Sequence, residues 1–134
     1  GFVFEVDFES LTLTNVRDSY GGGVWSLVTN PRGPTLALGC EDKTVKLFSY
    51  ANSSSLEYEK SFPSTGSRVL SVAFNPIAAH VLAGCADGTI RCYDEVTGSS
   101  LFRLTGDGLK GMKMASCIWS LVVLADEAQT IVSD

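Results

Sequence analysis

The stretch Gly39-Cys40-Glu41-Asp42-Lys43-Thr44-Val45-Lys46-Leu47-Phe48 returns later in the chain as Gly84-Cys85-Ala86-Asp87-Gly88-Thr89-Ile90-Arg91-Cys92-Tyr93. Its first residues, Gly39 and Gly84, are 45 positions apart. Upstream, Val24-Trp25-Ser26-Leu27 returns as Val69-Leu70-Ser71-Val72 at the same offset of 45. Two segments that keep one spacing indicate a structural unit that is repeated along the chain.

Traces of two further units flank these repeats. The segment Ile118-Trp119-Ser120-Leu121 follows the second opening by 49 residues, and Gly1–Asp7 aligns with Gly88–Asp94. The chain therefore contains two nearly complete units and parts of two others.

Each unit has the residue pattern of short β-strands. The runs Val69–Phe74 and Ile118–Leu124 are apolar and rich in β-branched residues. Prolines at 31 and 76 break the chain at matching points, since proline ends a strand or occupies a turn. Asp42-Lys43 and Asp87-Gly88 are expected to be hairpin turns. More polar outer strands follow at 57–62 and 100–104, and no segment has sustained helical periodicity.

The predicted fold is all-β: a fragment of a WD-repeat β-propeller, whose blades have four strands and about 40–45 residues. The two full blades are expected at 24–62 and 69–104, with partial blades at 1–20 and 117–134. Known propellers close with roughly four to eight blades, and the chain lacks an initiator Met, so we expect a longer protein. The residues expected in the core are Leu36, Cys40, Val45, Leu47, Val72, Phe74, Leu82, Cys85 and Ile90.

Composition restricts the possible partners. The chain is 45% hydrophobic and 19% charged, with a net charge of −5, so we expect any contact with RNA to be indirect. No apolar run is long enough for a membrane span, and no secretory signal is present. The four cysteines include no Cys-x-x-Cys pair and there is a single histidine, so no metal site is expected. Free thiols in a reducing compartment explain the cysteines better than a Cys40–Cys85 bridge.

No group of residues suggests catalysis, a cofactor or a small-molecule substrate. Asp42 and Asp87 are interpreted as turn residues that bond their own turn amides. His80 lies beside no nucleophile and is interpreted as a surface residue. The run 21–23 consists of three glycines, but it lacks the Lys-Ser/Thr and the helix of a phosphate loop. A flexible lead-in to the first strand explains that run.

Trp25 and Trp119 open equivalent strands, so core packing is expected for both. Arg68 is a basic residue at the start of a strand, where propellers often contact partners. Arg68 and Glu41 are therefore the candidate partner contacts.

Four segments together resemble the cirhin family of nucleolar WD-repeat proteins in the small-subunit processome. They are Val24-Trp25-Ser26, Gly39-Cys40-Glu41-Asp42, Val45-Lys46-Leu47-Phe48 and Ser67-Arg68-Val69-Leu70-Ser71. The resemblance implies a non-enzymatic scaffold in the nucleus and nucleolus that supports small-subunit pre-rRNA processing and ribosome biogenesis. Its partners would be other processome proteins.

An alternative with the same fold is a substrate-recognition propeller of another complex, such as a ubiquitin ligase. The chain also departs from the general WD pattern. Phe48-Ser49 and Tyr93-Asp94 stand where a Trp-Asp pair is usual. Packing of these two aromatic rings is therefore expected to contribute more to stability.

Overall fold

The computed structural model describes the chain except for residues 53–54, 106–116, 126–129 and 134. The described residues form β-strands, turns and loops and contain no helix, so the all-β prediction is confirmed. The strands are β1 (Phe2–Asp7), β2 (Thr12–Asp18), β3 (Val24–Thr29), β4 (Thr35–Cys40), β5 (Val45–Ser49), β6 (Glu57–Ser61), β7 (Val69–Phe74), β8 (His80–Cys85), β9 (Ile90–Asp94), β10 (Ser100–Leu104), β11 (Ser120–Val123) and β12 (Thr130–Ser133).

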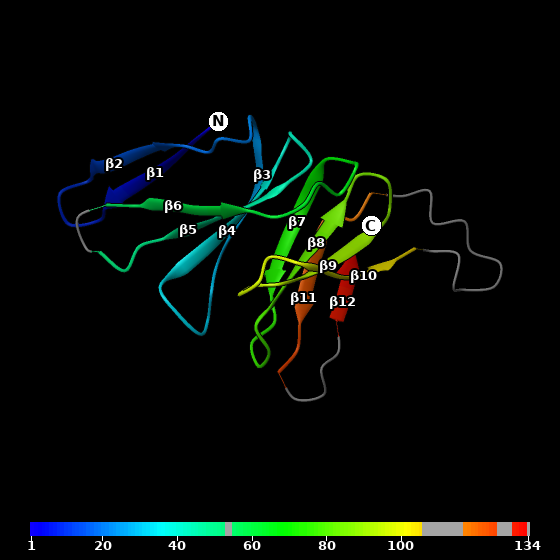
Figure 1. Cartoon of the computed structure of the whole chain (residues 1–134). Helices are drawn as coiled ribbons and strands as arrows, with labels where there is room; N and C mark the ends of the chain where they lie inside the picture. The colour runs from blue at the N-terminus through cyan, green and yellow to red at the C-terminus, as the bar shows by residue number, and fades with distance from the viewer. Residues whose placement is uncertain (53–54, 106–116, 126–129, 134) are drawn as a thin grey trace.

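Antiparallel pairing groups these strands into four successive sheets (Figure 1). Strands β3 to β6 form one four-stranded sheet in chain order, and β7 to β10 form a second. A two-stranded sheet, β1–β2, precedes them, and another, β11–β12, follows. Strand β7 lies between β3 and β11, so the first strands of three successive sheets are neighbours in space. This is the arrangement of consecutive propeller blades.

The two four-stranded sheets share their irregularities as well as their strands. The pairing of the first two strands shifts between Val24 and Ser26 in one sheet, and between Val69 and Ser71 in the other. Each shift places a β-bulge at the second residue of the first strand. The repeat therefore specifies the distortions of the strands in addition to their order.

The hairpin turns also match. Lys43 and Gly88 have φ angles of 71° and 77°, so the same turn position is left-handed in both units. Asp42 Oδ1 accepts hydrogen bonds from the amide and hydroxyl of Thr44, and Asp87 Oδ1 accepts the same pair from Thr89. The interpretation of both aspartates as turn residues is confirmed.

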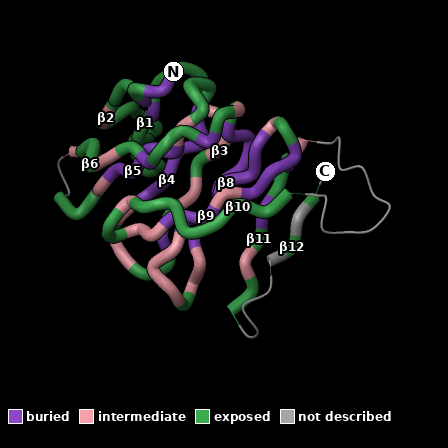
Figure 2. The backbone as a smooth tube through the Cα atoms, turned by 45° about the vertical axis from the view of Figure 1, so that its right-hand side comes forward, coloured by how far each residue is buried: buried purple, intermediate pink, exposed green. Residues whose placement is uncertain are grey.

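Burial is concentrated where the sheets face one another. Figure 2 shows buried backbone along β4, β5 and β8, whereas β2 and β10 are exposed. One cluster joins the first and second four-stranded sheets, with Val45 and Leu47 on one side and Val72 and Phe74 on the other. The nine predicted core residues are all buried, with exposed fractions of 8% or less.

Two equivalent glycines allow adjacent sheets to approach closely. A Cβ atom at Gly39 would lie 2.8 Å from Cγ1 of Val69 and 2.9 Å from its carbonyl oxygen. At Gly84 it would lie 2.4 Å from Cγ2 of Ile118. In each case the second strand of one sheet meets the residue that opens the next sheet. A side chain at either glycine would force the sheets apart.

Equivalent serines form hydrogen bonds between the first strands. Ser26 Oγ accepts a hydrogen bond of 3.2 Å from the amide of Val72, and Ser71 Oγ donates one of 2.9 Å to the carbonyl of Ile118. Ser71 is 4% exposed, so its hydroxyl needs this partner. The hydroxyl acts as an acceptor in one contact and as a donor in the other, which a serine permits.

At the other end of the first strands, a polar cluster joins the two four-stranded sheets. Glu95, in the turn between β9 and β10, accepts a hydrogen bond of 2.6 Å from Asn30 and forms an ion pair with Arg32. Lys60 on β6 donates bonds of 2.8 Å to the carbonyls of Glu95 and Val96. Sequence reasoning missed this cluster because the partners are 35 to 65 residues apart.

The two aromatic residues that replace the usual tryptophan do pack as expected. Phe48 is 0% exposed and Tyr93 is 1% exposed. The Tyr93 ring lies 5.3 Å from Phe62, and its hydroxyl donates a bond of 2.8 Å to Pro63 O. Burial raises the pKa of Tyr93 to about 12. The hydroxyl therefore remains a donor throughout the neutral range.

Replacing Gly39 with alanine is expected to lower the free energy of unfolding by about 1–3 kcal/mol, because the new methyl group would overlap Val69. The matched control is Gly33→Ala, since nothing lies within 4 Å of a Cβ at Gly33. The control should be neutral or slightly stabilising. Urea denaturation of both variants measures the difference, and equal midpoints would contradict the close approach.

Native-state thiol labelling should separate Cys117 from the other cysteines. All four are free, and Cys40, Cys85 and Cys92 are buried whereas Cys117 is half-buried. Burial raises the pKa of Cys85, and it raises that of Cys40 and Cys92 to about 11. Because the thiolate is the reactive form, iodoacetamide should modify Cys117 first. Mass spectrometry before and after unfolding measures this, and early modification of Cys40 would show that its burial is wrong.

Candidate protein-binding surface

Both tryptophans are about half-exposed in the part of the chain that the structure describes, where core packing was expected. Trp25 is 46% exposed and Trp119 is 56% exposed, whereas Leu70, the equivalent residue of the second sheet, is 5% exposed. The reason is that β7 lies between two other first strands. Strands β3 and β11 each border β7 on one side and have no such neighbour on the other among the described residues.

Trp25 forms a three-residue cluster with the two candidate contacts, Glu41 and Arg68. Its indole Nε1 donates a hydrogen bond of 2.6 Å to Glu41 Oε2. Arg68 Nε lies 4.0 Å from Glu41 Oε1, and the guanidinium carbon lies 5.8 Å from the centroid of the Trp25 ring. The side chains of Arg68 and Glu41 are 50% and 47% exposed. We call these three residues the rim cluster.

The local backbone fixes where each member of the rim cluster stands. Trp25 occupies the bulge of β3. Glu41 directly follows β4, and its amide donates a bond of 2.8 Å to Gly23 O. Arg68 directly precedes β7, and its carbonyl accepts a bond of 2.9 Å from Ala86 N. The cluster therefore spans the first and second four-stranded sheets on an ordered backbone.

The contacts within the rim cluster are of types that stabilise a fold only weakly. Exposed ion pairs contribute about 0–1 kcal/mol, and exposed cation–π contacts contribute about 0.5–1 kcal/mol. Their geometry places the Arg68 guanidinium beside the Glu41 carboxylate and over the Trp25 ring. A guanidinium that is already oriented loses less entropy when it binds a further group.

The equivalent location between the second sheet and β11 has a different chemistry. Leu70, Ala86 and Cys117 occupy the places of Trp25, Glu41 and Arg68. The last two positions are again neighbours, but here the Cys117 thiol lies 3.3 Å from the backbone carbonyl oxygen of Ala86. Packing between sheets thus does not require an aromatic ring or an ion pair at this position.

The glycine run beside the rim cluster is held in place, which corrects its interpretation as a flexible lead-in. Gly21 O accepts a bond of 3.0 Å from the amide of Asp42. A Cβ at Gly21 would lie 2.6 Å from Cys40 Sγ, and Gly22 has a φ of 71°. Glycine is needed here for close packing and for a left-handed backbone.

An ion pair between Lys46 and Asp42 stabilises the turn that follows β4. Lys46 Nζ lies 2.9 Å from Asp42 Oδ2 and donates a hydrogen bond of 3.0 Å to Ser61 Oγ. Burial acts to raise the pKa of Asp42, but its bonds with Lys46 and Thr44 outweigh that and leave it lowered. The Asp42 carboxylate is therefore ionised at neutral pH, and its contacts are with residues of the turn and with Lys46.

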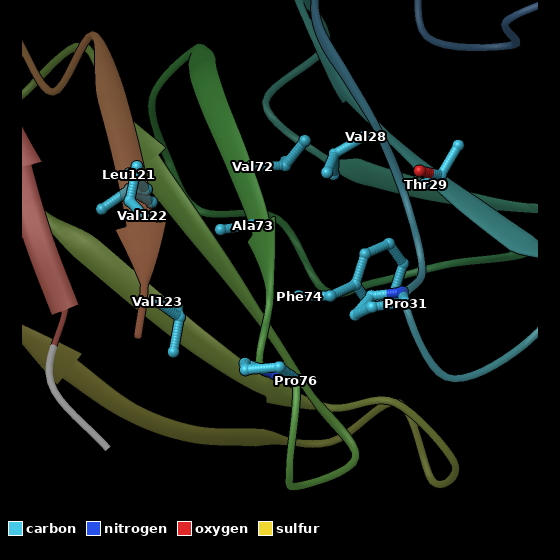
Figure 3. A pocket seen from close by; sticks show the side chains of 10 residues that line it. All are labelled: Val28, Thr29, Pro31, Val72, Ala73, Phe74, Pro76, Leu121, Val122 and Val123. Carbon is cyan, nitrogen blue, oxygen red and sulfur yellow. The ribbon is translucent and has the colours of Figure 1, made fainter. Parts of the chain in front are cut away.

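A shallow apolar pocket of about 270 Å³ lies at the other end of the first strands (Figure 3). Side chains from β3, β7 and β11 line it, and Pro31 and Pro76 occupy equivalent places at its edge. Thr29 supplies its polar atom. Such a pocket can receive an apolar side chain but offers little to orient it.

Across the described ranges, no three His, Cys, Asp or Glu side chains gather as metal ligands would. His80, the first residue of β8, is half-buried. No described helix reaches the length and apolarity of a membrane span. The rim cluster brings together an aromatic ring, a carboxylate and a guanidinium that are each about half-exposed, and it is the candidate protein-binding site.

Comparison with known proteins agrees with this fold. Residues 12–49 and 56–94 match the family described as WD domain, G-beta repeat. Each matched repeat begins with the outer strand of one sheet and ends with the third strand of the next, namely β2 to β5 and β6 to β9. Each repeat thus contributes to two sheets and ties them together covalently.

Two curated relatives are similar over part of the chain. The human U3 small nucleolar RNA-associated protein 4 homolog is 36% identical over 62 residues, which is 46% of this chain and 9% of that protein. The mouse protein of the same name is 42% identical over 48 residues, covering 36% of this chain and 7% of its own length. The matches thus span less than a tenth of either relative. The sheets and the two matched repeats together show that this chain belongs to the WD-repeat family.

Proposed function

We propose that this chain is part of a non-catalytic scaffold in a nucleolar complex that processes small-subunit pre-rRNA. The observation that carries the proposal is the 36% identity to the human U3 small nucleolar RNA-associated protein 4 homolog. That name belongs to the cirhin family, which the segments around Trp25 and Gly39 resemble. The fold supports a scaffold, because WD-repeat domains mediate protein–protein interactions.

The rim cluster is the proposed contact with a protein partner, with Arg68 and Glu41 as its charged members and Trp25 as its aromatic member. Tryptophan and arginine are enriched among residues that dominate binding energy at protein interfaces. Half-exposed side chains on an ordered backbone can be covered by a partner with little rearrangement.

Proteins of the same complex are the proposed partners, and contact with pre-rRNA is proposed to be indirect. The net charge of −5 is unfavourable for binding the phosphate backbone of RNA, because proteins bind phosphates through clustered lysines and arginines. The sites of action would be the nucleus and the nucleolus. No cofactor, metal ion or small-molecule substrate enters the proposal.

Depletion of the full-length protein should cause precursors of the small-subunit rRNA to accumulate and should lower the mature rRNA. The reason is that loss of a scaffold prevents assembly of the proteins that act on the precursor. Northern hybridisation against precursor segments measures the effect, with the large-subunit rRNA as the internal control.

Unchanged small-subunit precursors after depletion would overturn the proposal. Copurification of the tagged protein separates it from the alternative with the same fold. Processome proteins and pre-rRNA in the eluate support the scaffold, whereas a cullin-type ligase in their place would assign the chain to substrate recognition for ubiquitin transfer.

A further inference from the structure

We infer that the rim cluster receives a carboxylate, the side chain of an Asp or Glu of a partner protein, on the outward-facing nitrogens of Arg68. The inference rests on the proposed function, since it names the chemistry of the partner at the proposed contact. It follows from the geometry of Arg68, from an internal comparison between repeats, and from the charge around the site.

The geometry leaves one edge of the guanidinium available. Its Nε faces Glu41 Oε1 at 4.0 Å, and one face lies over Trp25. In the described part of the chain, no hydrogen bond or ion pair engages the two terminal nitrogens of Arg68. A planar guanidinium whose Nε faces an acid and whose face lies over a ring presents those two nitrogens as a fork. A carboxylate fits this fork through two parallel hydrogen bonds.

The second repeat serves as an internal control for what the fold requires. Leu70, Ala86 and Cys117 fill the equivalent places, and Leu70 is 5% exposed. The sheets pack at both locations, so the fold alone does not explain the ring, the acid and the guanidinium of the rim cluster. All three groups are instead explained if Glu41 and Trp25 orient Arg68 toward a ligand.

The surrounding charge favours a single carboxylate over a chain of phosphates. Glu41 is paired with Arg68, Asp42 follows Glu41 in the turn after β4, and the chain as a whole has a net charge of −5. A nucleic acid would bring several phosphates close to these acidic residues, and the acidic residues would repel every phosphate. One acidic side chain on a neutral or basic partner surface brings a single negative charge, which Arg68 pairs directly.

The test places a lysine amine at position 68 and couples it chemically to an adjacent carboxylate of the partner. The full-length protein carrying Arg68→Lys and Glu41→Gln is purified with its partners and treated with a carbodiimide, which joins an amine to an adjacent carboxylate. The Glu41→Gln change prevents coupling within the cluster. Arg103→Lys is the matched control, because Arg103 is also exposed and lies on β10, away from the cluster.

Mass spectrometry should find position 68 joined to an Asp or Glu of a partner, with no such product from Arg103→Lys. In parallel, Arg68→Gln should lower partner recovery about tenfold, since a charge-assisted pair is lost. Recovery of the partners without a cross-link at position 68 would overturn the inference while the proposed scaffold stands.

The same complex distinguishes a phosphate from a carboxylate. Phenylglyoxal modifies exposed guanidinium groups, and Arg68 should be protected from it in the complex both before and after ribonuclease treatment. Protection that disappears with ribonuclease would assign the site to RNA and overturn the inference. Failure of the unsubstituted protein to recover any partner would instead count against the proposed function.

Discussion

The structure depends on how closely one sheet can approach the next. Gly39 and Gly84 leave space for Val69 and Ile118, which open the following sheets and are both fully buried. The apolar cluster between the sheets, the serine bonds between first strands and the Glu95 contacts all require that short separation. A sheet of four short strands cannot bury its two faces alone, so stability arises between repeats rather than within one. The boundaries of the sequence repeats do not coincide with those of the sheets. Each repeat therefore supplies strands to two sheets, which also makes stability depend on neighbouring repeats.

In this repeated fold, some equivalent positions keep the same residue and others do not. The glycine and the turn aspartate occupy equivalent places in both full units and make equivalent contacts, and the serine in each unit bonds to the backbone of the next unit. At the rim, by contrast, the same backbone positions carry Trp25, Glu41 and Arg68 in one place and Leu70, Ala86 and Cys117 in the other. The side chains at the rim can thus differ from one interface between sheets to the next while the packing of the sheets is kept.

Sequence reasoning predicted what one repeat specifies by itself: strand order, turn positions and the alternation that buries residues such as Leu36 and Ile90. It failed where burial depends on neighbours. Trp25 and Leu70 are equivalent in sequence, but among the described residues only the strand of Leu70, β7, has another first strand on each side. Arg68 and Glu41 are predicted partner contacts, and their contact with each other and with Trp25 depends on two sheets meeting. The Glu95 cluster was missed for the same reason. The available signal in the sequence was the polar pair Asn30 and Arg32, which flank Pro31, together with the acidic Glu95 in the turn after β9.

The central claim is that sheets made from separate stretches of sequence are packed together at the glycines. Hydrogen exchange measured peptide by peptide on Gly84→Ala tests it directly, because a methyl group on β8 at this position would strike both Ser71 of the same sheet and Ile118, which precedes β11. The account predicts faster exchange in peptides covering β8 and also in those covering β11, with Gly33→Ala unchanged in both. Faster exchange confined to β8 and its strand partners, with β11 as protected as before, would contradict it.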